Sequence, residues 1–100
     1  MSSKLVRDNI PEITAAQGRQ FKFRTASKEE MLSLLAQKLQ EETSEFLEDN
    51  NAEELADILE VVLNLSAELG VSETDLFEIM NKKRERNGGF SRRVVIELAP

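Results

Sequence analysis

Two apolar stripes with helical spacing, separated by the short polar break Asp49-Asn50-Asn51, constrain the fold of this chain more than any other feature. An apolar residue at every third or fourth position gives a helix one face that must be covered by a neighbour. A break this short favours two antiparallel helices that lie side by side. The pattern therefore predicts an all-α fold. The first stripe is Met31, Leu35, Leu39 and Phe46, and the second is Leu55, Ile58, Leu59, Val62, Leu65 and Leu69.

Local start and stop signals predict about four helices in a single domain that spans residues 1–100. Pro11 suits a first helical turn, and Gly18 follows as a stop. Ser27 begins a capping-box pattern, and Gly70 ends the third helical segment. The predicted helices cover residues 10–17, 27–48, 51–70 and 72–88. The fold class is a helical bundle.

Three short segments outside these helices leave strands open as an alternative to extended chain. They are residues 4–7, 21–24 and 94–96, which are β-branched or alternate apolar with basic side chains. Val61 and Leu63 widen the second apolar stripe, so that helix is expected to contact neighbours on more than one side. We therefore expect a homodimer or homotetramer to complete the bundle.

The composition excludes several kinds of chemistry. The chain has no Cys and no His, so thiolate sites, His-ligated metals and catalytic triads are all ruled out. An enzyme of this composition must use carboxylates, Lys, Arg, hydroxyls or a metal ion. No apolar run approaches the length of a membrane span or a signal peptide, so we expect a soluble cytoplasmic protein without a membrane partner.

Charge is segregated along the chain. Residues 29–80 carry fifteen acids against the single Lys38, whereas residues 1–28 and 81–100 each carry a net charge of +4. An acidic centre with basic ends suits a metal-chelated polyanion, although the ends can equally neutralise the middle within the fold. The overall charge of −6 argues against a nucleic-acid partner.

Two pairs of carboxylates lie on or beside the apolar stripes. Glu42 and Glu45 are three residues apart, as are Glu54 and Asp57, so each pair shares one side of its helix. At about 100° per residue, Glu42 falls in the middle of the first stripe, where a charge without a partner is costly. Facing carboxylates are hard oxygen ligands, and Mg²⁺ is the natural cation for them, with Mn²⁺ as a second candidate.

Simpler interpretations exist for several of these residues. Glu54 occupies the third position of a capping box, which accounts for it fully. Lys38 is either a salt-bridge partner of Glu41 or Glu42 or a phosphate ligand. Core packing is favoured over base stacking for the aromatic residues Phe21, Phe23 and Phe90.

The ordered motifs resemble those of the MazG-like and phosphoribosyl-ATP pyrophosphohydrolase-like members of the all-α NTP pyrophosphatase superfamily. Glu41-Glu42-x-x-Glu45 followed by Glu54-x-x-Asp57 is similar to the EExxE and ExxD signature of that group. The start, KLVRDNIP from Lys4, and the close, KRERNGGF from Lys83, resemble the two ends of its small branch. Asn9 and Asn87 depart from the pattern, since basic residues are expected there in many relatives.

The resemblance implies that nucleoside triphosphates are hydrolysed to monophosphates and pyrophosphate. It assigns magnesium binding to Glu42, Glu45, Glu54 and Asp57. Glu41 or Glu45 would orient or deprotonate the attacking water, and the phosphates would be neutralised by Lys38, Lys83 and Arg86. Phosphoribosyl-ATP hydrolysis in histidine biosynthesis is the alternative substrate assignment, and a non-catalytic helical dimerisation module is the alternative from another class.

Overall fold

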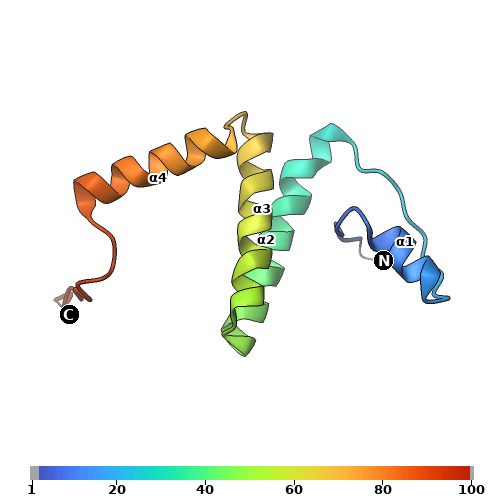
Figure 1. Cartoon of the computed structure of the whole chain (residues 1–100), viewed down its shortest axis with the longest axis horizontal. Coiled ribbons are helices and arrows are strands. Elements are labelled where there is room, and N and C mark those ends of the chain that lie inside the picture. Colours follow the sequence, from blue (N-terminus) through green and yellow to red (C-terminus); the bar gives the residue numbers. More distant parts are fainter. Residues whose placement is uncertain (1–2, 100) are drawn as a thin grey trace.

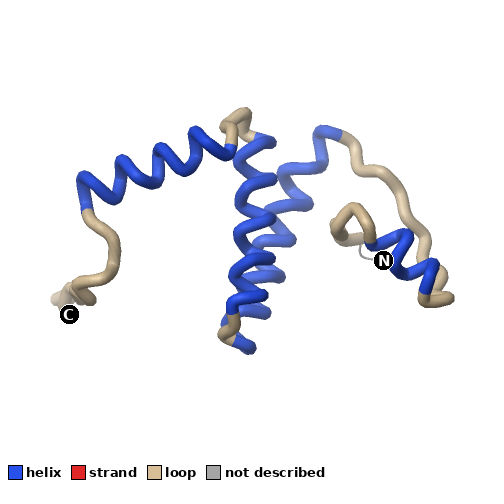
Figure 2. Tube along the Cα trace, viewed as in Figure 1, coloured by secondary structure: helices blue, strands red, loops and turns tan. Residues whose placement is uncertain are grey.

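The computed structural model describes residues 3–99, and all of its regular structure is helical (Figures 1 and 2). The elements are α1 (Ile10–Ala16), the 3₁₀ turn η1 (Lys28–Glu30), α2 (Met31–Asp49), α3 (Ala52–Glu68) and α4 (Glu73–Asn87). The prediction of an all-α bundle of about four helices is confirmed.

Residues 3–99 contain no strand, so the three segments for which strands were left open are irregular chain. Residues 94–96 are exposed, and nothing in the described part of the chain offers them a sheet edge. An isolated pair of short strands is marginal in water. The β-branched composition alone is therefore insufficient to form a strand here.

The helix ends follow the predicted signals closely. The Ser27 amide donates to the Glu30 carboxylate at 2.8 Å, as part of a complete capping box that leads through η1 into α2. Asn50 ends α2 in the left-handed conformation (φ 49°), and the Asn51 side chain accepts from the Glu54 amide at 3.0 Å to start α3. Two residues therefore reverse the chain, and α2 and α3 run antiparallel (Figure 1).

The α2–α3 pair forms the packed centre of the molecule. Among the described residues, Leu35 on α2 and Val61 on α3 are the only large apolar residues that are buried, and neither is completely so. Helix α3 turns its Val61 face toward α2, and this rotation leaves Leu55, Leu59 and Leu69 about half exposed or more. The predicted second stripe is therefore covered on one side only, and a single copy of the chain leaves its other apolar side chains exposed.

The outer helices make the molecule elongated. Helix α4 contacts α3 near the chain reversal at Gly70 and then leads away from the pair, while α1 lies on the opposite side (Figure 1). The radius of gyration is 17.6 Å, against about 13 Å for a compact chain of this length. None of the described helices is long and apolar enough to span a bilayer.

The expectation that Phe21, Phe23 and Phe90 pack in the core is wrong. Phe90 is almost wholly exposed, and Phe21 and Phe23 are about half exposed. These two rings contact each other edge to face, with centroids 6.3 Å apart, and the Arg19 guanidinium lies over Phe21. Both rings lie in the irregular segment that precedes η1 and α2.

Candidate metal centre

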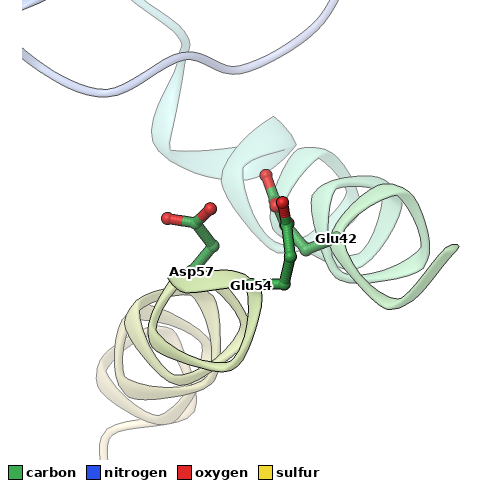
Figure 3. A group of neighbouring side chains, drawn as sticks. All are labelled: Glu42, Glu54 and Asp57. Carbon is green, nitrogen blue, oxygen red and sulfur yellow. The ribbon is translucent and has the colours of Figure 1, made fainter. Parts of the chain in front are cut away.

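Three carboxylates from α2 and α3 lie close together near the turn that joins these two helices. Glu42 comes from α2, and Glu54 and Asp57 come from the first turns of α3 (Figure 3). One oxygen of each carboxylate lies within 4.8 Å of the corresponding oxygens of the other two. We call these three residues the acidic cluster. Such a spacing of like charges is unfavourable unless protons or cations compensate it.

Glu42 lies inside the interface between the two helices. The residue is 6% exposed, as its place in the first apolar stripe predicted. Its Oε1 lies 3.3 Å from the Lys38 Nζ, one helical turn earlier, but its Oε2 is buried without a hydrogen-bond partner among the described residues. A buried carboxylate oxygen left unpaired is a costly arrangement and needs an explanation beyond packing.

Glu54 presents a second orphaned oxygen. Its amide is used in the cap of α3, but its carboxylate points into the cluster, and Oε2 is buried without a partner in the part of the chain that the structure describes (Figure 3). The capping interpretation therefore accounts for the backbone of Glu54 and leaves its carboxylate unexplained. Two unpaired oxygens from different helices consequently lie in the same small region.

The electrostatics of the cluster favour protonation or a bound cation. Loss of water raises the pKa of Glu42, and the neighbouring Glu45 and Asp57 charges add to this, while Lys38 opposes it. Loss of water also raises the pKa of Glu54, together with the charges of Glu45 and Asp57. A divalent cation would reverse both shifts, since it favours the ionised forms.

Asp57 of the cluster and the nearby Glu41 form ion pairs with basic residues from the N-terminal segment. The Arg7 Nη2 donates to the Asp57 Oδ1 at 2.7 Å, and the Lys4 Nζ lies 3.3 Å from the Glu41 Oε1. Lys38 approaches the other Glu41 oxygen at 3.4 Å. Burial would raise the pKa of Glu41, but the two lysines outweigh it and lower that pKa.

The other predicted site residues are placed differently. Glu45 is not among the three clustered carboxylates, although its charge is felt by Glu42 and Glu54. Lys83 and Arg86 are exposed on α4. This helix begins beyond the C-terminal end of α3, which is the end farther from the cluster (Figure 1). From Asp57 to that end at Glu68 is about 16 Å along the helix axis. One chain does not bring these two basic residues to the cluster.

An open pocket of about 500 Å³ adjoins the cluster. Its charged lining residues include Arg7, Lys38, Glu42 and Asp57. Apolar side chains from the N-terminal segment, α1 and α2 also line it. These are Leu5, Val6, Ile10, Ile13, Met31 and Leu35.

Arg7 and Lys4 were not among the site residues predicted from motif and helical spacing. They lie in irregular chain, where no periodicity indicates which way a side chain points. The available signals were the basic charge of residues 1–28 and the KLVRD stretch itself. Neither signal specifies a contact with Glu41 or Asp57.

No family model, curated protein or solved structure matches this chain. The resemblance of its motifs to the all-α NTP pyrophosphatases therefore remains a prediction, and the function must be argued from the site.

Proposed function

We propose that the chain is a magnesium-dependent nucleoside triphosphate pyrophosphohydrolase, which converts an NTP or dNTP and water to the monophosphate and pyrophosphate. The observation that carries the proposal is the pair of orphaned, buried carboxylate oxygens of Glu42 and Glu54 beside Asp57. An acidic cluster on a surface would be unremarkable. Buried carboxylate oxygens that lack a partner among the described residues are better explained by a ligand that they bind.

The donor set fits a hard divalent cation. The cluster offers only carboxylate oxygens, which suit Mg²⁺ or Mn²⁺ and exclude a site built on soft ligands. Glu42, Glu54 and Asp57 would hold the cation, and Glu45, whose charge acts on both Glu42 and Glu54, would be a fourth ligand. A bound Mg²⁺ would supply polarisation of the phosphates and a more acidic water for attack on the α-phosphorus.

The remaining residues divide the work around this centre. Glu41, whose pKa is lowered by Lys4 and Lys38, stays ionised and can orient a water through hydrogen bonds. Glu45 is the other carboxylate suited to that task. Lys38 is held at the edge of the cluster by Glu41 and Glu42, where its ammonium can also offset charge on a phosphate.

We propose further that the active form is a homodimer or homotetramer. The exposed leucines of α3 and the low burial of the single chain support this, since so few apolar side chains are covered. Lys83 and Arg86 give a second reason, because in an assembly α4 of one copy can approach the cluster of another. Their assignment as phosphate ligands depends on such an arrangement.

A substrate panel tests the activity directly. Pyrophosphate release would be measured with canonical, deoxy, oxidised and phosphoribosyl nucleotides, in Mg²⁺ and in EDTA. We expect Mg²⁺-dependent release that Glu42→Gln reduces at least 100-fold, on the order of what loss of an essential charged group costs. Glu48→Gln, an exposed position near the end of α2, is the matched control and should retain full activity.

Each outcome of the panel has a defined meaning. Preference for phosphoribosyl-ATP would assign the chain to histidine biosynthesis. Hydrolysis that survives Glu42→Gln would reject the cluster as the catalytic centre. A folded protein that neither binds metal nor hydrolyses any nucleotide would be the non-catalytic helical module.

A further inference from the structure

The N-terminal segment, residues 4–10, is joined to the acidic cluster and to the adjacent Glu41 by two ion pairs. Lys4 reaches Glu41, and Arg7 reaches Asp57. Helix α1, whose first residue Ile10 is the last of the segment, makes no close backbone contact with the other described helices. The segment also forms one wall of the pocket through Leu5, Val6 and Ile10. Any other cation that binds Glu41 or Asp57 would therefore weaken the attachment of this segment.

Arg7 and a divalent cation need the same carboxylate. The guanidinium already occupies the Asp57 Oδ1 at 2.7 Å, and Asp57 is one of the three clustered ligands. A cation bound by Asp57 would compete for the charge of this carboxylate and repel the guanidinium. Lys38 differs, because it lies on α2 one turn from Glu42 and stays within reach of the cluster whether paired or not.

We propose that Arg7 is the internal counter-ion of the metal-free cluster and a phosphate ligand once metal and nucleotide have bound. A bound divalent cation would displace the guanidinium from Asp57, and the freed side chain would remain in the pocket that Lys38 also lines. A guanidinium binds phosphate oxygens in a bidentate manner, so an incoming polyphosphate recaptures it and draws residues 4–10 over the substrate. The phosphate role rests on the whole proposed function, whereas the competition for Asp57 rests only on the proposed metal centre and requires no catalysis.

The competition is tested by calorimetric titration of Mg²⁺ into the full chain without nucleotide. Arg7→Gln removes the competing charge, so its Mg²⁺ affinity should rise about two- to five-fold, in keeping with an ion pair that is half exposed. Arg19→Gln is the matched control: it makes the same charge change in the same region, away from the cluster, and should leave the affinity near that of wild type. An unchanged or lower affinity for Arg7→Gln would overturn the counter-ion role.

The phosphate role is tested at saturating Mg²⁺ with a nucleotide whose α–β bridge cannot be hydrolysed. Arg7→Gln should bind this analogue about ten-fold or more weakly than wild type and Arg19→Gln, as expected for loss of a charge-assisted contact. Equal affinity of Arg7→Gln and wild type would overturn the role. If wild type binds Mg²⁺ but not the analogue, the proposed function fails while the result of the first titration still stands.

Circular dichroism of each variant provides the folding control. The helices should persist in Arg7→Gln, because the exposed Arg7 side chain contributes no helical cap or core contact. As a second readout, NMR on wild type should show the Arg7 side-chain N–H signal shifting as Mg²⁺ saturates, while the Arg19 signal stays in place. Equal shifts for the two arginines would indicate general screening and overturn the specific exchange at Asp57.

Discussion

The carboxylates of this chain have pKa values shifted in opposite directions, depending on which groups lie next to them. Glu30 accepts from the Arg24 guanidinium at 2.6 and 3.0 Å and from the Ser27 amide, so its charge is well compensated. Glu42 and Glu54 each keep an oxygen that has no donor within residues 3–99, and their pKa values are raised. The contrast separates a carboxylate that completes a helix start from carboxylates that are available to a ligand.

The compensated residue gives a pH prediction. The Arg24 and Ser27 hydrogen bonds lower the pKa of Glu30 from its ordinary 4.5 to about 2. The folded state therefore holds this proton less tightly than the unfolded state. The stabilisation is present in full above about pH 4.5 and is lost as the pH falls toward 2. NMR titration of the Glu30 carboxyl carbon should show this low midpoint, and Arg24→Gln should raise it.

The matched stability measurement compares wild type with Glu30→Gln across the same pH range. Wild type should have the higher Tm at neutral pH, and the difference should shrink as Glu30 becomes protonated. A Glu30 midpoint near 4.5 in wild type, or a Tm difference that does not change with pH, would contradict the capping-box geometry.

At the scale of elements, the position of the cluster depends on where α3 begins. Asn51 starts the helix, and only three and six residues separate it from Glu54 and Asp57. Asn50, in the left-handed conformation, fixes the direction in which the chain reverses. The cap and the turn thus determine that the side of α3 that carries Glu54 and Asp57 faces Glu42 on α2.

Loss of that cap should destabilise the protein measurably. Asn51→Ala removes the acceptor for the Glu54 amide and should lower the free energy of unfolding by about 1 kcal/mol in urea titrations. Asn81→Ala is the control, since Asn81 is exposed within α4 and forms no cap. Equal stability of the two variants would show that Asn51 does not act as the cap.

At the scale of the whole molecule, the chain leaves much apolar surface uncovered. The buried apolar residues of the described chain are few, and the exposed ones include Leu55, Leu59 and Leu69 of the α3 helix and its end. A single α-helical hairpin with two outlying helices has no third layer to cover these side chains. The elongated shape and the proposed assembly are therefore two consequences of the same arrangement.

The assembly should depend on the α3 face. Light scattering after size-exclusion chromatography should give at least twice the 11.3 kDa of one chain, and Leu59→Glu should shift the mass to that of a monomer. Leu47→Glu places the same charge on an exposed leucine of α2 and should leave the mass unchanged. A wild-type monomer at 100 μM would reject the proposed assembly.

The sequence predicted those features that depend on periodicity and local chemistry. The four helices, the Ser27 and Asn51 caps and the burial of Glu42 follow from spacing along one helix. The rotation of α3 and the direction of α4 depend on packing between elements, which a single helical pattern leaves open. Arg7 was missed for a related reason, since its contact with Asp57 joins residues fifty positions apart through irregular chain.

The most direct test of the central claim is calorimetric titration of Mg²⁺ and Mn²⁺ into wild type, Glu54→Gln and Glu53→Gln. Glu53 is the adjacent exposed residue in the same helical turn, outside the cluster, so it controls for the loss of one charge. We predict saturable binding to wild type and Glu53→Gln, and affinity at least ten-fold lower for Glu54→Gln. Equal affinities for the two variants, or no saturable binding to wild type, would contradict a metal centre formed by Glu42, Glu54 and Asp57.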